Sequence, residues 1–117
     1  MESRYRAPAP SVEAAPALTL SPLCGRSGLR AAGEISLGTR GAWEQALEVV
    51  LCEDDDVYYL ELSAVTFADV AGVGALAAAA QRLTDGRRLV LHRPPTVVCR
   101  VLEMFWPGIP AIEVSMS

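Results

Sequence analysis

Two kinds of hydrophobic spacing follow one another along this chain. Residues 57–62 alternate, so that Tyr58, Leu60 and Leu62 share one face of an extended strand. Residues 38–51 instead place apolar side chains three and four positions apart from Trp43 onward, the spacing of one helical face. Strand and helix segments that alternate in this way form a sheet covered by helices, so the pattern predicts an α/β domain.

The same two spacings, followed along the whole chain, predict five strands and three helices. We expect strands at 18–23, 29–35, 57–62, 87–92 and 111–114. The expected helices are 38–51 with Thr39 as N-cap, one that follows a loop at 63–69 and ends at Gly86, and one from Pro94 to Pro107. The first two strands form a hairpin, and right-handed crossovers make the later strands parallel. The predicted fold is a mixed β-sheet of about five strands with an opening hairpin and three to four packed helices.

The 117-residue length suits one domain. Three prolines, Pro8, Pro10 and Pro16, keep the beginning of the chain out of helix and sheet. We therefore expect a flexible leader at residues 1–17 and a single domain at residues 18–117.

Charge and hydropathy exclude two classes of partner. The net charge is −4 and no basic stripe is present, which argues against a nucleic-acid partner. No apolar run approaches the ~20 residues of a membrane span, and residues 1–10 lack the apolar core of a secretory signal. We expect a cytoplasmic protein, and the abundance of Ala and Arg without lysine suggests a bacterial genome.

The side chains that usually carry catalysis are sparse. Cys24, Cys52 and Cys99 lie far apart and form no CxxC pair, so they are predicted to be reduced and not to bind metal. His92 is the only histidine, at a strand end, and no Ser or Cys elbow stands beside it. We predict no enzymatic activity, no metal and no cofactor.

One glycine motif resembles a nucleotide site. Gly72 to Ala77 reads GxGxxA at the start of a predicted helix. A dinucleotide site needs these glycines in a tight turn directly after the strand, whereas residues 63–71 intervene here. Close packing of the helix on the sheet explains the small residues more simply. Nucleotide or small-ligand binding stays open as the alternative function.

Three stretches together resemble the STAS domain family, which includes anti-sigma factor antagonists. Gly33-Glu34-Ile35-Ser36 is similar to the Gly-Glu-Leu-Asp that precedes the first helix of the family. The segment from Tyr59 to Asp69 resembles the central strand and its terminal Asp, and Gly72 to Leu76 resembles the Gly-Leu-Gly helix start. The resemblance extends from about Leu18 to the end of the chain and implies a regulatory domain that binds proteins.

The resemblance also brings out a difference at the regulatory position. Family members that act as phosphorylation switches carry a serine after the Asp, and an anti-sigma kinase phosphorylates it. The matching residue here is Val70, followed by Ala71, so neither position has a hydroxyl. Ser36 likewise replaces the Asp of the first stretch. Either the domain binds its partner constitutively, or its partner surface serves another use.

What the resemblance implies for function is an anti-sigma factor antagonist without the phosphorylatable serine. Its partner would be a kinase-type anti-sigma factor or another regulatory protein, and a homodimer is a further possibility. By resemblance, the partner-binding residues are Glu34, Ser36, Thr39, Arg40, Asp69, Val70, Ala71, Gly72, Val73 and Gly74. Asp69 also has a local role to fill, because an Asp before a helix is a strong N-cap.

Overall fold

The computed structural model describes residues 17–116, so the predicted leader lies outside the described residues except for Ala17. The strands are β1 (Leu18–Pro22), β2 (Gly28–Ile35), β3 (Val57–Ala68), β4 (Arg88–His92) and β5 (Ile112–Ser115). The helices are the short 3₁₀ helix η2 (Leu37–Thr39), α1 (Arg40–Cys52), α2 (Val70–Gln81) and α3 (Thr96–Phe105). No helix within the described residues is long and apolar enough to cross a membrane.

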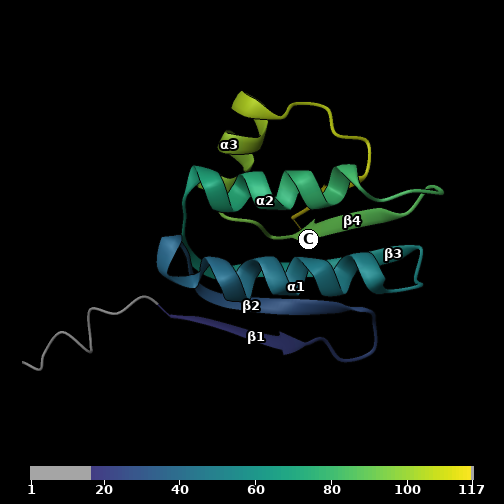
Figure 1. The fold of residues 1–117 in the computed structure, drawn as a ribbon, viewed down its shortest axis with the longest axis horizontal. Coiled ribbons are helices and arrows are strands. Elements are labelled where there is room, and N and C mark those ends of the chain that lie inside the picture. The colour runs from purple at the N-terminus through teal and green to yellow at the C-terminus, as the bar shows by residue number, and fades with distance from the viewer. Residues whose placement is uncertain (1–16, 117) are drawn as a thin grey trace, which may run out of the picture.

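The five strands form one sheet in the order β1-β2-β3-β4-β5 (Figure 1). Strands β1 and β2 pair antiparallel as a hairpin, and the other neighbours pair parallel. This arrangement confirms the predicted fold class, including the opening hairpin and the parallel crossovers.

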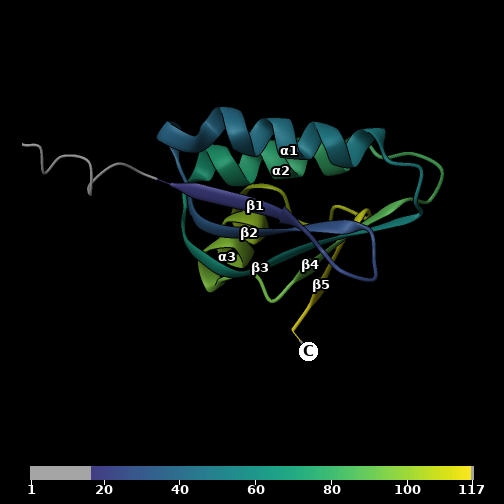
Figure 2. The same cartoon turned by 90° about the horizontal axis from the view of Figure 1, so that it is seen from below.

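Helices α1 and α2 lie together on one face of the sheet (Figure 2). Tyr58, Leu60 and Leu62 of β3 are buried beneath this layer, as their alternation predicts. The alanines of α2 that face the core are fully or almost fully buried, which lets α2 approach the sheet closely. Helix α3 packs beside α2 on the β4 side of the domain (Figure 1).

The predicted loop at residues 63–69 is wrong, because β3 continues to Ala68. The pairing of β2 with β3 shifts register twice, between Arg30 and Ala32 and between Gly33 and Glu34. Each shift places one additional β3 residue opposite β2, as a β-bulge does. A bulge breaks the period of two, so the buried positions move to Val65 and Ala68. The hydrophobic alternation therefore stops at Leu62 although the strand does not.

The helix ends also differ from expectation by a few residues. Helix α1 begins at Arg40 because Leu37–Thr39 forms the separate turn η2. Helix α2 ends at Gln81, five residues before Gly86. Pro95 is the N-cap of α3, so the helix proper begins at Thr96.

Candidate functional site

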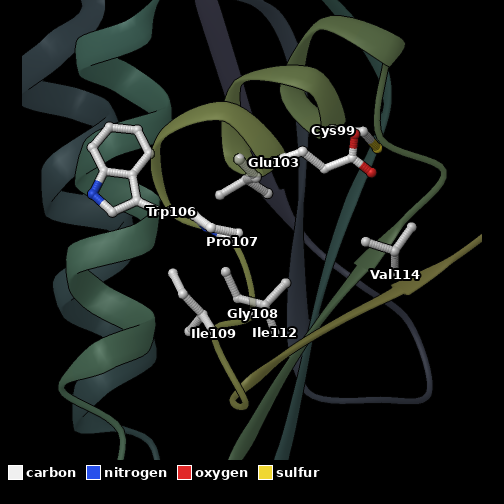
Figure 3. Close-up of a pocket in the computed structure, with 9 residues that line it drawn as sticks. Cys99, Glu103, Trp106, Pro107, Gly108, Ile109, Ile112 and Val114 are labelled. Atoms are coloured by element: carbon white, nitrogen blue, oxygen red, sulfur yellow. The ribbon is translucent and has the colours of Figure 1, made fainter.

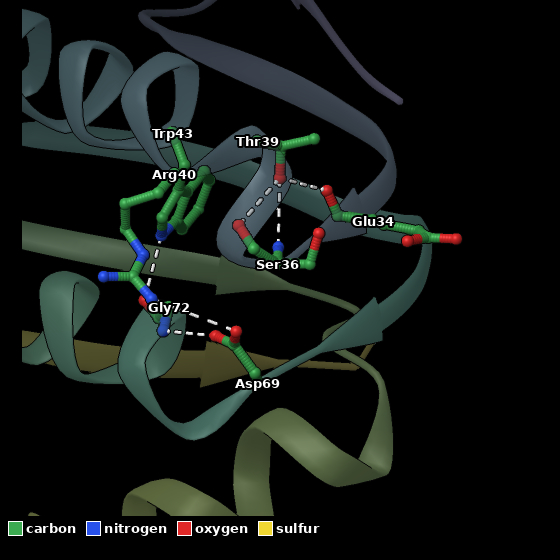
Figure 4. Close-up of polar contacts among 7 residues, drawn as sticks. All are labelled: Glu34, Ser36, Thr39, Arg40, Trp43, Asp69 and Gly72. Carbon is green, nitrogen blue, oxygen red and sulfur yellow. Dashed lines mark hydrogen bonds and ion pairs between the residues drawn. The ribbon is translucent and has the colours of Figure 1, made fainter. Parts of the chain in front are cut away.

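The predicted site residues come together at the carboxyl ends of β2 and β3. These parallel strands end side by side, with Ile35 opposite Ala68. The backbone N–H of Asp69 donates to the carbonyl of Ile35 at 3.0 Å, which joins the two chain segments after they leave the sheet. Figure 4 shows the residues around this junction, which come from the end of β2, the start of α1 and the start of α2.

Thr39 holds the end of β2 rather than capping α1 through its hydroxyl. Its Oγ1 accepts from the backbone N–H of Ser36 at 3.0 Å and donates to the carbonyl of Glu34 at 2.7 Å (Figure 4). Thr39 occupies the predicted N-cap position, but its side chain makes no bond to the N–H groups of α1. The 3₁₀ turn η2 directs the hydroxyl back toward the strand, so the expected cap bond is wrong.

Asp69 is the N-cap of α2, as predicted. Its Oδ1 accepts from the backbone N–H of Gly72 at 2.7 Å. Its Oδ2 lies 3.9 Å from Nη2 of Arg40, a separation that is an ion pair but no hydrogen bond. The Nε of Arg40 is buried and has no hydrogen-bond partner among the described residues. The Arg40 side chain is 28% exposed, so its guanidinium is only partly accessible beside the start of α2.

Trp43 and Gly72 lock α1 onto α2. The indole Nε1 of Trp43 donates to the carbonyl of Gly72 at 2.9 Å, and the Trp43 side chain is buried (Figure 4). A Cβ placed on Gly72 would lie 2.5 Å from Cγ2 of Ile35, far inside van der Waals contact. Gly72 is therefore small because α2 begins directly against the end of β2. This confirms the packing interpretation of the glycine motif.

Replacing Gly72 with alanine should therefore destabilise the protein although alanine favours helices. The new methyl group would overlap Ile35, and we expect a loss of about 1–3 kcal/mol in the free energy of unfolding. Gly41→Ala in α1 is the matched control, because a Cβ there meets no atom within 4 Å. The control should be neutral or gain up to about 1 kcal/mol. Urea unfolding followed by circular dichroism measures both, and equal shifts in the two variants would contradict the packing interpretation.

Apolar side chains are exposed around this junction. Leu37 in η2 is 79% exposed, Phe67 at the end of β3 is 49% exposed, and Val70 at the start of α2 is 48% exposed. Ala71 is exposed as well. We call Leu37, Arg40, Phe67, Val70 and Ala71 the α2 N-terminal surface. An apolar cluster of this kind, bordered by a charged group, is typical of a protein-binding site.

The predicted site glycines, with Val73, lie beneath this surface. Gly72 and Val73 are buried, and Gly74 faces the ring of Trp106, whose Cη2 would lie 3.0 Å from an added Cβ. These residues support the surface from below, whereas Val70 and Ala71 are exposed on it. Glu34 and Ser36 stay partly exposed at its border.

A separate polar cluster lies on neighbouring positions of β3 and β4, which pair Glu61 with His92. Glu61 accepts from Ser63 and contacts Nδ1 of His92. Burial alone would raise the pKa of Glu61, but the hydrogen bonds from Ser63 and His92 outweigh it and hold that pKa below its ordinary value. The sequence carries no signal for this pair, because Glu61 and His92 are far apart in the chain and meet only when β3 and β4 pair.

Two further observations bear on catalysis and metal binding. Across residues 17–116, no three His, Cys, Asp or Glu side chains converge closely enough to hold a metal ion. Burial raises the pKa of the Cys99 thiol, and the charge of Glu103 raises it further. A thiol with a raised pKa is a poor nucleophile at neutral pH.

Comparison with known proteins extends these observations. The family model described as "Mlab, STAS domain" matches residues 25–105, which is well over half of the chain. A comparison with curated proteins gives no significant match.

Two solved structures are similar over most of their length. A crystal structure of an anti-sigma factor antagonist from Mycobacterium paratuberculosis matches with a TM-score of 0.64 and 23% identity, covering 87% of this chain and 86% of that one. The anti-sigma factor antagonist SpoIIAA in its unphosphorylated form matches with a TM-score of 0.59 and 17% identity, covering 86% and 90%. At these identities the two structures establish a shared fold.

Proposed function

The chain belongs to the STAS domain family, and on that premise we propose that it is a non-catalytic regulator of the anti-sigma factor antagonist type. Its partner would be a kinase-type anti-sigma factor or a related regulatory protein in a bacterial cytoplasm. The observation that carries the proposal is the exposed Val70 at the first position of α2, beside the capping Asp69.

The identity of residue 70 matters because the N-terminus of a helix attracts negative charge. The N–H groups and the dipole at the start of α2 would favour a phosphate there, and a serine at residue 70 would supply its acceptor. Valine presents two methyl groups instead. In our proposal the α2 N-terminal surface is thus permanently in the uncharged form and binds its partner without a phosphorylation switch at this position.

The other members of the surface fit a protein partner. Leu37 and Phe67 supply exposed apolar area near the junction, and the charged side chain of Arg40 is partly exposed there. Arginine is among the residue types enriched at energetic hot spots, and exposed apolar side chains beside it add contact area. We infer that the partner presents an apolar segment with an acceptor group, a carboxylate or a carbonyl, toward Arg40.

Installing the missing hydroxyl tests the role of residue 70. We expect Val70→Ser to acquire phosphate from a kinase-type anti-sigma factor with ATP, since the substitution places an exposed hydroxyl beside Asp69 at the start of α2. The wild-type chain is the control, because its residues 70–73 carry no hydroxyl that could accept phosphate. Phosphopeptide mass spectrometry after incubation with the purified kinase gives the readout. Absence of phosphate on Val70→Ser under conditions where the kinase is active would contradict the assignment of residue 70 to the regulatory position.

The small-ligand alternative keeps one specific observation in its favour. The glycines of the GxGxxA motif pack against Ile35 and Trp106 and do not form an open phosphate loop. An apolar pocket beside α3 remains as the place where a ligand would bind. A thermal-shift measurement with GTP, ATP and NAD tests nucleotide binding. A rise in melting temperature with a nucleotide would support a nucleotide site at the glycine motif.

A further inference from the structure

An open pocket of about 310 Å³ lies between α3, the loop that follows it and β5 (Figure 3). Its lining is mostly apolar and includes Leu102, Trp106, Ile109 and Ile112. The volume is at the lower end of the range for small-molecule sites, which are concave and mostly apolar. The pocket is separate from the α2 N-terminal surface, so its use does not depend on the proposed function.

The pocket is formed before any ligand arrives. The backbone N–H of Trp106 donates to Leu102 at 2.8 Å, and that of Ile112 donates to Ile109 at 3.2 Å, which fixes both ends of the loop. The Trp106 ring packs against Gly74 of α2, where an added Cβ would come within 3.0 Å of it. Because these wall residues are already ordered, binding a ligand loses little conformational entropy of the protein.

The polar groups of the pocket define its ligand. Glu103 is the only charged residue among those that line it, and its carboxylate lies beside Cys99, on the side away from the Trp106 ring (Figure 3). Cys99 lies one helical turn before Glu103 and adds a weakly polar thiol. An anionic ligand would meet the Glu103 charge without any compensating cation from the lining. A cation on an apolar body would satisfy both the walls and the carboxylate.

We propose that this pocket binds a small molecule with an apolar body and one positively charged amine, which pairs with Glu103. The apolar body lies against Trp106, Ile109 and Ile112, and the amine stays at the opening where water still reaches it. The ion pair is partly solvated, so the walls supply most of the affinity and Glu103 supplies the preference for a cation.

Three matched probes test this proposal at pH 7: 2-phenylethylamine as cation, 2-phenylethanol as neutral analogue and phenylacetate as anion. The chain has two tryptophans, and Trp43 is buried away from the pocket, so the two indole N–H signals in a ¹H–¹⁵N spectrum report separately. Trp106→Phe assigns them. We expect the amine to shift the Trp106 signal saturably while leaving that of Trp43 in place. The amine should bind about two- to fivefold more tightly than the alcohol, and phenylacetate most weakly.

Glu103→Gln should abolish the preference for the amine over the alcohol while retaining the binding of both. Glu113→Gln on β5, an exposed carboxylate outside the pocket lining, is the matched control and should keep the preference. The proposal is overturned if no probe shifts Trp106 saturably, or if Glu103→Gln keeps the preference. It is also overturned if the Trp106 signal moves with protein concentration alone, since a second copy of the chain would then occupy the pocket. None of these results depends on residue 70, so they leave the proposed function to its own test.

Discussion

Replacing Trp43 with alanine should lower the free energy of unfolding by about 3–5 kcal/mol, as truncation of a buried aromatic side chain does. Trp43 is only 1% exposed and is among the largest fully buried side chains of the core. The substitution removes both its packing and the hydrogen bond from Nε1 to Gly72. Urea unfolding followed by far-ultraviolet circular dichroism measures the change without relying on tryptophan fluorescence.

Trp43→Phe separates the two contributions. Phenylalanine keeps most of the apolar contact but cannot donate to the carbonyl of Gly72, so we expect a smaller loss of about 1–3 kcal/mol. Because that bond joins α1 to the start of α2, the Phe variant should also loosen the α2 N-terminal surface. Faster amide exchange at Val73, whose N–H bonds to the carbonyl of Asp69, would report it. A loss below about 1 kcal/mol for Trp43→Ala would show that the indole is not a central core element.

The fold could be predicted from the sequence because each element carries its own local signal. The alternation of Tyr58, Leu60 and Leu62 predicted the first half of β3, and the spacing that starts at Trp43 predicted α1. The apolar spacing that starts at Val73 predicted α2, and Asp69, a short acidic side chain before that stretch, was predicted to cap it. The order of these elements then left few possible topologies.

The contacts that build the site could be predicted only in part. The resemblance placed Arg40 and Asp69 near one another, but the ion pair between them depends on the turn η2, which has no distinct sequence pattern. Thr39 shows the same limit, since a hydroxyl before a helix can bond forward or backward with similar local sequence. The bulges in β3 were missed because they alter the hydrophobic period itself.

The apolar pocket could not be predicted from the sequence either. Trp106, Ile109 and Ile112 are apolar residues near the end of the chain, and such residues are more often core than interface. In the structure they are half-buried and share a concave wall, since the loop after α3 turns back over the sheet. The path of that loop determines whether these three side chains fill the core or line an open pocket.

Val70→Asp should weaken binding of the protein partner by about 100-fold. An aspartate at residue 70 would place a second carboxylate beside Asp69 and leave a charge unpaired in an apolar contact, much as phosphate on a serine would. The start of α2 tolerates a negative charge, so the fold itself should be stable. The loss would therefore belong to the interface, and circular dichroism of the free variant checks this.

The most direct test of the proposed function measures that loss against a control of equal exposure. The wild-type chain, Val70→Asp and Val49→Asp are each used to capture partners from the native cytoplasm, and the dissociation constant of the purified partner is then determined. Val49 lies on α1 and is 44% exposed, against 48% for Val70. We predict that wild type and Val49→Asp bind a kinase-type anti-sigma factor with equal affinity and that Val70→Asp loses it. Equal binding by all three chains would contradict a docking site at the start of α2.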